Sequence, residues 1–159
     1  MDISNGEGVG VSLFVQGCLF KCLNCFNPET WDFNGGKEWN KEIENQFIEL
    51  AKRPYIKRVS ILGGEPLADE ILQDVINLVN KIRLLLPDKT IWLYTGYRFE
   101  ECLGHKTRKE IILKCDVLVD GRYIDNLRDI SLKWRGSSNQ RVIDIKSTFE
   151  HNCVKLYTT

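Results

Sequence analysis

The stretch around which this chain is organised reads Gly17-Cys18-Leu19-Phe20-Lys21-Cys22-Leu23-Asn24-Cys25-Phe26, and it places three thiols within eight residues. It follows the apolar run Val11-Ser12-Leu13-Phe14-Val15, which predicts a buried strand. Thiolates are soft ligands that bind zinc, copper(I) and iron–sulfur clusters. A structural zinc site or an ordinary 4Fe–4S cluster uses four protein ligands. Three thiols from one loop therefore favour a cluster with one iron left free to hold a small molecule.

Other interpretations of the cysteine loop stay open. Cys22 and Cys25, spaced C-x-x-C, could form a redox pair, although Cys18 then has no role. A zinc loop could be completed by His105, His151 or a distant cysteine. The three thiols could also be buried structural groups. Of these interpretations, the iron–sulfur cluster leads.

Length, charge and cysteine usage limit the class of protein. The 159 residues suit a single domain, with a tail from about residue 146 that could be peripheral. Lys+Arg and Asp+Glu balance at 22 each, so no net charge draws the chain to nucleic acid or to a membrane. We find no signal peptide and no membrane span in the sequence. Clustered cysteines indicate a reducing compartment, and we expect a cytoplasmic protein.

Strand-like and helix-like segments alternate along the chain, which predicts an α/β fold with a parallel sheet. The expected strands are residues 10–16, 58–62, 90–94, 117–119 and 142–145. The expected helices are residues 41–52, 71–86 and 99–114, with Gly104 as a break in the last and a single helical turn at 28–31. A closed (β/α)₈ barrel takes about 250 residues, so about four or five strands predict an open, partial barrel.

Three of the expected strands end in unusual residues. The cysteine loop follows the first strand, Gly63-Gly64-Glu65-Pro66 follows the second, and Asp120-Gly121-Arg122 follows the fourth. Parallel α/β folds gather their sites at the carboxyl ends of strands, which favours one composite site. Two simpler interpretations stay open. Glu65 could sit in a plain turn before the next helix, and Asp120 with Arg122 could form a surface ion pair.

The spacing C-x-x-x-C-x-x-C after a strand resembles the signature of the radical S-adenosylmethionine (SAM) enzymes. Six further segments narrow the resemblance, and they occur in this order: Asn5-Gly6-Glu7-Gly8, Leu13–Cys18, Cys25–Trp31, Gly63-Gly64-Glu65-Pro66-Leu67, Ile91–Tyr97 and Trp134–Gln140. Together they resemble the family of proteins that activate anaerobic (class III) ribonucleotide reductases. The resemblance covers residues 5–145.

The resemblance implies a radical SAM partial barrel and a radical-generating enzyme. Cys18, Cys22 and Cys25 would hold three irons of a 4Fe–4S cluster, and the fourth iron would bind SAM. With an electron from a donor such as flavodoxin, SAM would be cleaved to methionine and a 5′-deoxyadenosyl radical, which would remove hydrogen from a glycine of the large reductase subunit. The alternatives are an activator of another glycyl-radical enzyme, a small-molecule radical SAM enzyme, or a non-catalytic zinc or redox module.

The resemblance also implies which residues contact SAM. Gly63, Gly64 and Glu65 would hold its amino group, and Asn24, Cys25 and Phe26 would lie alongside the adenosine. Asp120 would serve the ribose hydroxyls or a bound cation, Arg122 would pair with the methionyl carboxylate, and Thr95 would line the same pocket.

The resemblance leaves one difference from the family and the roles of several residues unexplained. Related activators usually carry Arg where this chain has Gly10, which puts the contacts of that Arg in doubt here. Cys102, Cys115 and Cys153 match no cluster spacing, and we interpret them as structural. The role of residues 134–140, which we expect at the rim of the site or against a partner, does not follow from the sequence.

Overall fold

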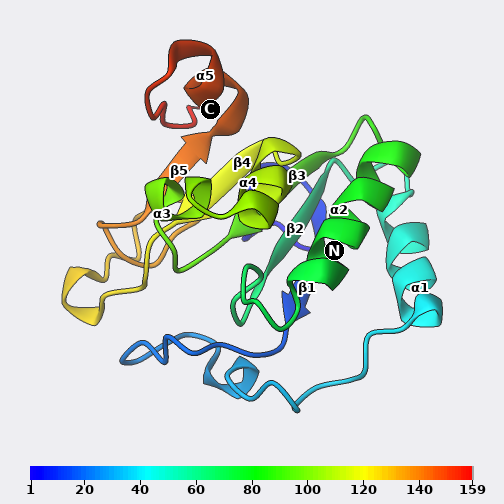
Figure 1. Ribbon diagram of the computed structural model, residues 1–159, viewed down its shortest axis with the longest axis horizontal. Coiled ribbons are helices and arrows are strands. Elements are labelled where there is room, and N and C mark those ends of the chain that lie inside the picture. The colour runs from blue at the N-terminus through cyan, green and yellow to red at the C-terminus, as the bar shows by residue number, and fades with distance from the viewer. Residues whose placement is uncertain (159) are drawn as a thin grey trace.

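The computed structural model describes residues 1–158 and is built on one five-stranded sheet with the strand order β1-β2-β3-β4-β5 (Figure 1). The strands are β1 (Gly10–Val15), β2 (Arg58–Gly63), β3 (Thr90–Tyr94), β4 (Val117–Asp120) and β5 (Arg141–Asp144). The first four run parallel, which confirms the prediction for them, but β5 is antiparallel to β4. An all-parallel sheet was therefore the wrong prediction for the last strand. No α-helix crosses over between β4 and β5, and a chain that returns directly pairs antiparallel.

The helices follow the expected order. They are α1 (Lys41–Ala51), α2 (Leu72–Leu85), α3 (Phe99–Leu103), α4 (Lys106–Leu113) and α5 (Ile145–His151), with short 3₁₀ turns η1 (Pro28–Thr30) and η2 (Asp125–Leu127). The Asn40 side chain accepts a hydrogen bond from the Ile43 amide at 3.0 Å and caps α1. Gly104 separates α3 from α4, as predicted. No helix within residues 1–158 combines the length and the apolar character that a membrane crossing needs.

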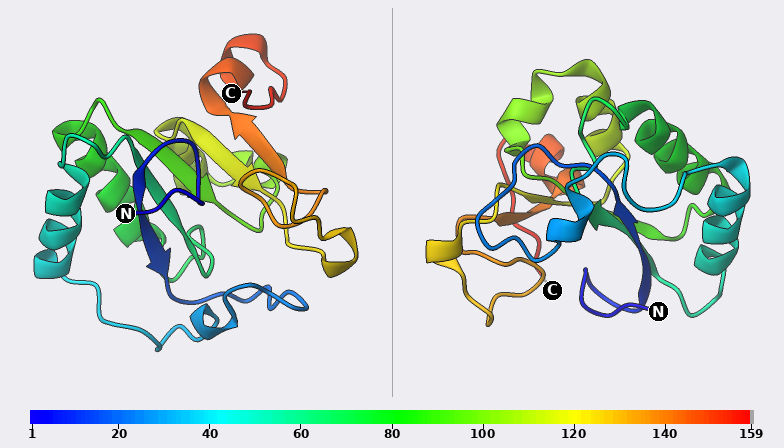
Figure 2. Two further views of the ribbon diagram at one scale, coloured as in Figure 1. Left: turned by 180° about the vertical axis from the view of Figure 1, so that it is seen from behind. Right: turned by 90° about the horizontal axis from the view of Figure 1, so that it is seen from below.

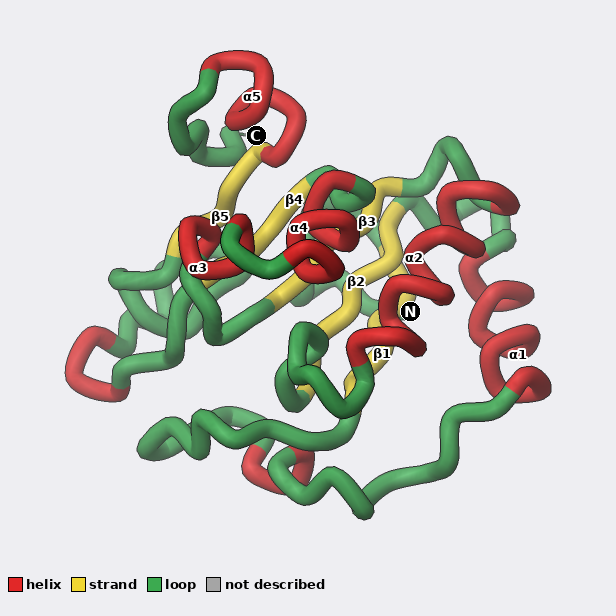
Figure 3. Tube along the Cα trace, in the orientation of Figure 1, coloured by secondary structure: helices red, strands yellow, loops and turns green. Residues whose placement is uncertain are grey.

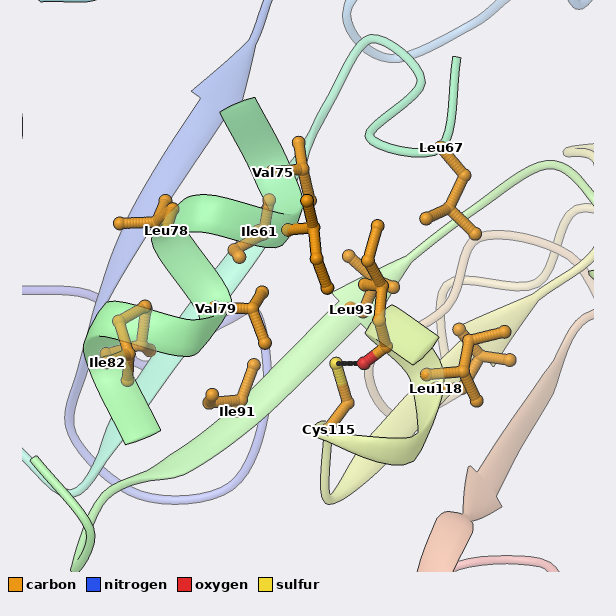
Figure 4. Close-up of a cluster of buried hydrophobic side chains, with 14 of the residues drawn as sticks. Ile61, Leu67, Val75, Leu78, Val79, Ile82, Ile91, Leu93, Cys115 and Leu118 are labelled. Carbon is orange, nitrogen blue, oxygen red and sulfur yellow. Dashed lines mark hydrogen bonds between the residues drawn. The ribbon is translucent and has the colours of Figure 1, made fainter. Parts of the chain in front are cut away.

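Helices cover one face of the sheet, which we call the outer face, and bury its apolar side chains (Figure 4). Ile61 of β2, Leu93 of β3 and Leu118 of β4 lie side by side across the sheet and are fully buried. Val79 and Ile82 of α2 belong to the same core. Cys102 and Cys115 are buried in it too, in agreement with a structural role.

Helix α1 turns one side toward the sheet. Phe47, Ile48 and Ala51 are buried, whereas the apolar Leu50 is exposed. Packing against the sheet thus decides which apolar side chains of this helix are covered.

Within residues 1–158, no helix covers the opposite, inner face of the sheet. The view from behind in Figure 2 shows the N-terminal segment crossing the strands on this face. Trp92 of β3 packs edge-on against Trp134 at 4.9 Å and against Tyr157 at 5.2 Å between ring centroids. The tail that we expected to be peripheral thus contributes Tyr157 to this face. Strands β1 and β5 remain the two edges, so the sheet is open, and long loops extend from its carboxyl end (Figure 3).

Candidate functional site

A cavity of about 530 Å³ opens at the carboxyl ends of the parallel strands. Its wall includes Cys18, Cys22 and Cys25, the Gly63-Gly64-Glu65 segment, Thr95, Phe26 and Arg122. The structure therefore brings together most of the residues that the sequence singled out. The wall also includes residues of the N-terminal segment and of the stretch 129–136.

Gly17 begins the cysteine loop at a position that only glycine can occupy. Its φ is +103°, and a Cβ there would lie 2.0 Å from the ring of Phe33. The Gly17 amide donates to the Thr30 carbonyl at 2.8 Å, and the Gly17 carbonyl accepts from the Glu65 amide at 2.8 Å. These bonds tie the start of the loop both to the turn after it and to the segment that follows β2.

The three cysteines are free and partly buried, and backbone amides surround them. The Asn27 amide donates to Cys25 Sγ at 3.4 Å. Burial raises the pKa of Cys18, against hydrogen bonds from two loop amides. Burial and the neighbouring Cys25 raise the pKa of Cys22, against the Tyr123 amide and the Arg122 charge. Donors and a cation placed in this way stabilise thiolates, the form that binds metal.

Cys18, Cys22 and Cys25 all line the same open cavity. Within residues 1–158, no group of three or more His, Cys, Asp or Glu side chains has the geometry to hold a single metal ion. An iron–sulfur cluster takes its thiolates on separate irons, so its ligands need not converge on one point.

Glu65 is buried at the junction of β2 and β3. Its carboxylate accepts hydrogen bonds from the Leu67 amide at 2.9 Å, the Thr95 hydroxyl at 2.7 Å and the Gly96 amide at 2.7 Å. Burial nevertheless raises the pKa of Glu65. A carboxylate in this state gains from any cation that arrives beside it.

The two glycines before Glu65 are required by close packing. Gly63 has a φ of +107°, and a Cβ on Gly64 would lie 2.4 Å from the Gly17 carbonyl oxygen. Any larger side chain would push the cysteine loop away from the end of β2.

Phe20 is a site residue that sequence reasoning missed. Its ring lies 4.3 Å from the Arg122 guanidinium carbon and packs edge-on against Tyr97 at 4.9 Å between centroids. A Cβ on Gly96 would lie 2.4 Å from the Phe20 ring. Phe20 thus fixes where Arg122 stands in the cavity. The available signal was an aromatic residue between two of the three cysteines.

Asp120 lies elsewhere than expected. Its side chain is fully buried, does not line the cavity, and binds Arg141 Nε at 3.0 Å and Nη2 at 2.5 Å. It also accepts from the Phe99 amide at 2.8 Å. Along β4, Asp120 shares the outer face with Leu118, whereas Val119 faces inward. Asp120 therefore holds α3 and β5 to the sheet, without contact with the cavity.

The cysteine loop is held from outside by residues 121–140. The Asn24 side-chain amide donates to the Asp125 carboxylate at 2.8 Å, and Phe26 packs on Tyr123 at 5.0 Å between centroids. Asn24 itself does not line the cavity, whereas Cys25 and Phe26 do. The Asn24 hydrogen bond helps to lower the pKa of Asp125.

Residues 134–140, whose role the sequence left open, form part of the cavity rim. The Gln140 side chain accepts from the Gly136 amide at 2.9 Å and donates to the Gly121 carbonyl at 2.9 Å. In residues 1–158, the Tyr94 hydroxyl and Arg135 Nε are buried side-chain donors without a hydrogen-bond partner, and both residues line the cavity. Sequence reasoning missed Tyr94. Both donors are available to an acceptor, whether water or ligand, that enters the cavity.

Comparisons with known proteins agree with this site. Residues 4–143 match the family model described as a 4Fe-4S single cluster domain. The chain is 41% identical over 144 residues to the anaerobic ribonucleoside-triphosphate reductase-activating protein of Escherichia coli strain K12, which covers 89% of this chain and 92% of the relative. The protein of the same name from Enterobacteria phage T4 is 38% identical over 141 residues, with 89% and 87% covered.

A third relative of the same name, from Vibrio cholerae, is 39% identical over 142 residues, with 88% of this chain and 90% of the relative covered. No solved structure matches the chain at a significant level. Identity at this level over nearly the whole length of both chains decides the assignment. The chain belongs to the family of anaerobic ribonucleoside-triphosphate reductase-activating proteins.

Proposed function

We propose that this protein is an activating enzyme that uses a 4Fe–4S cluster and SAM to generate a glycyl radical on an anaerobic ribonucleotide reductase. One observation carries the proposal. A single cavity at the carboxyl ends of the parallel strands unites three half-buried thiols with a buried carboxylate and an arginine, in a chain of this family. The fold that we infer is an open radical SAM partial barrel, of which the open α/β sheet is the frame.

In this proposal, Cys18, Cys22 and Cys25 bind three irons as thiolates. When bound, the cluster supplies the electron that cleaves SAM to methionine and a 5′-deoxyadenosyl radical, which takes a hydrogen atom from a glycine of the reductase. Burial raises the pKa of Cys18 and of Cys22, and this effect is opposed by backbone amides at both thiols and by the Arg122 charge at Cys22. These opposing groups favour the thiolates that a cluster needs.

The cavity wall orients SAM by charge. Gly63, Gly64 and Glu65 receive its ammonium group, because the buried carboxylate is stabilised by a cation. Thr95 acts through Glu65, whose oxygen it binds at 2.7 Å. Arg122, held against Phe20, pairs with the methionyl carboxylate. Cys25 and Phe26 lie alongside the adenosine. We place Asn24 in support of them through Asp125, and we give Asp120 no contact with SAM.

The mouth of the cavity suits a protein substrate. Leu19, Leu23 and Ile130 are more than two-thirds exposed, at 72%, 74% and 89%, and Phe26 is 55% exposed. Phe26 and Ile130 line the cavity, and Leu19 and Leu23 belong to the cysteine loop on its wall. Exposed apolar side chains of this kind favour an interaction surface. We propose that a glycine-bearing segment of the large reductase subunit docks here, and that an electron donor such as flavodoxin reaches the cluster from the same exposed loop.

The test is made on anaerobically purified protein, reduced and incubated with SAM and the large reductase subunit. We expect a brown protein with about four irons per chain, a glycyl radical by electron paramagnetic resonance, and transfer of deuterium from the glycine Cα to 5′-deoxyadenosine. A colourless protein with one zinc would overturn the proposal. So would a glycyl radical that forms without any label transfer, or rapid stoichiometric turnover with a small molecule in the absence of the reductase.

A further inference from the structure

Arg58 is fully buried on the inner face of β2, where a charged side chain needs a strong reason to lie. Apart from the Ser60 hydroxyl, all its hydrogen-bond acceptors belong to residues 2–8, which we call the N-terminal loop. They are the Asp2 carbonyl at 3.0 Å, the Asp2 carboxylate at 3.4 Å, the Asn5 carbonyl at 2.6 Å, the Glu7 carbonyl at 3.3 Å and the Gly8 carbonyl at 3.4 Å. One guanidinium thus binds four carbonyls along the loop.

The N-terminal loop forms part of the cavity wall. Ser4 and Asn5 both line the cavity that holds the three cysteines. The Asn5 carbonyl also accepts from the Ser60 hydroxyl at 2.5 Å. The loop lies so close to Arg58 that a Cβ on Gly6 would come within 2.4 Å of the Arg58 side chain. Arg58 therefore determines how far Ser4 and Asn5 lie from the inner face of the sheet.

Gly10 lies directly opposite Arg58 in the pairing of β1 with β2. A Cβ at Gly10 would lie 2.6 Å from the Arg58 guanidinium carbon and 2.8 Å from its Nη2 atom. These separations are far below contact distance, so a side chain at position 10 and the Arg58 guanidinium compete for one space. The Cβ would also lie 2.9 Å from the Arg58 carbonyl oxygen, so any side chain at position 10 also requires the backbones of β1 and β2 to move apart.

We propose that Arg58 is a positioning residue for the cofactor cavity. Its guanidinium holds the N-terminal loop so that Ser4 and Asn5 contact the ligand. A guanidinium carried by residue 10 could fill the same space and hold the loop in the same way. The ligand part rests on the proposed function, in which the ligand is SAM. The inference also accounts for the departure at Gly10, since the guanidinium that is missing there enters the same space from the neighbouring strand.

The first test is Arg58→Met, which removes the guanidinium charge and keeps the apolar part of the side chain. We expect amide hydrogen exchange in residues 4–8 to accelerate by at least about tenfold and the Kd for SAM to rise by about tenfold, with iron content unchanged. The exchange measurement needs neither SAM nor the cluster. Unchanged exchange in the loop, or unchanged SAM affinity in a protein that binds SAM in its natural form, would overturn the inference.

Two controls separate positioning from a general loss of stability. Arg53→Met removes an exposed arginine whose guanidinium bonds to Tyr55, and it should change neither readout. Leu93→Ala weakens the core on the outer face, and it should lower the Tm while leaving SAM affinity and loop exchange as they are. If Leu93→Ala shifts both readouts as much as Arg58→Met does, Arg58 only stabilises the fold and the inference fails.

The second test moves the guanidinium from one strand to the other. Arg58→Gly alone should behave like Arg58→Met, and Gly10→Arg alone should disturb the loop by crowding. The double variant Gly10→Arg/Arg58→Gly should recover SAM affinity to within about threefold of the natural protein. A double variant no better than Arg58→Gly would overturn the shared-space inference. If the natural protein fails to bind SAM, the proposed function fails, while loop exchange in these variants still tests the Arg58 anchor.

Discussion

The two faces of the sheet are held by different forces. The outer face buries Ile61, Leu93 and Leu118 under α2 and α4, and its contacts are almost all apolar. The inner face carries Arg58 and Ser60 in the same strand as Ile61, and a loop instead of a helix covers them. A buried apolar side chain stabilises the fold by about 1.5–3 kcal/mol wherever it fits. A buried polar group stabilises only if its partners are in place.

This difference indicates which residues specify the fold and which specify the functional site. Any set of apolar side chains with the right volume could cover the outer face. The inner face and the carboxyl ends of its strands depend on individual donors, acceptors and glycines, so single changes there should alter the site more than the fold. The following predictions test this contrast.

The largest effect is expected at the cysteine loop. Cys18→Ala, Cys22→Ala or Cys25→Ala should reduce SAM cleavage to background, because a cluster with one thiolate missing is incomplete. Iron content and 5′-deoxyadenosine formation measure the loss. Cys153→Ala is the matched control, since Cys153 is exposed, and it should retain both. Loss of the cluster in the Cys153 variant, with the cluster retained in the Cys18 variant, would contradict the assignment of the cluster ligands.

On the outer face, Leu93→Ala should lower the free energy of unfolding by about 2–5 kcal/mol, because it opens a cavity in a core where Leu93 is fully buried. Denaturant unfolding of the protein measures this. Leu93→Met conserves volume and should lose less than about 1.5 kcal/mol. Both folded variants should bind SAM with the natural affinity. A large loss of SAM affinity in either one would mean that the two faces are coupled.

Glu65→Ala should have a smaller effect than the cysteine variants and Leu93→Ala. We expect full iron content but a loss of SAM binding free energy of about 1.5–3 kcal/mol, because a charge-assisted acceptor for the ammonium is removed. Equilibrium dialysis of the reconstituted protein measures the affinity. The exposed Glu70→Ala is the control and should leave binding intact. Loss of iron at unchanged SAM affinity would assign Glu65 to the structure alone, through its bonds to Thr95 and Gly96.

The smallest effect is expected at Asp2 and depends on pH. Burial alone would raise the pKa of Asp2, but hydrogen bonds from Ser12, Ser4 and Asn5 and the Arg58 charge lower it from 3.8 to about 2. A lowered pKa means that the charged form stabilises the folded state, fully above pH 3.8 and less as the pH falls toward 2. Asp2→Asn should therefore cost about 1 kcal/mol at pH 6, since the group is partly exposed.

Unfolding free energies of the natural protein and of Asp2→Asn, compared at pH 6 and near pH 2, test this dependence. The difference between the two proteins should become much smaller at the lower pH, where Asp2 is partly protonated in the folded state. A difference that stays constant from pH 6 to pH 2 would show that the Asp2 charge contributes nothing to the folded state.

Much of the outer face could be predicted because its signals are local. Helical periodicity and the prolines and glycines that end elements identified α1, α2 and the break between α3 and α4. The first four strands were recognised as short apolar runs. The direction of β5 was missed because the alternation of the earlier strands and helices was extended to it, although no helix was expected between residues 119 and 142. The exposure of Leu50 depended on how α1 rotates against the sheet.

The sequence by itself determined the chemistry, because chemistry follows from residue type and short spacing: three thiols in one loop, two glycines before a carboxylate, and an arginine after β4. Only the tertiary structure decided which groups meet. Asp120 turned to the outer face because side chains alternate along a strand, so it lies on the side away from Val119. Arg58 fills the space above Gly10 because strand pairing sets the two residues side by side, although they lie far apart in the chain. Such contacts form only when distant segments pack, and no local pattern records them.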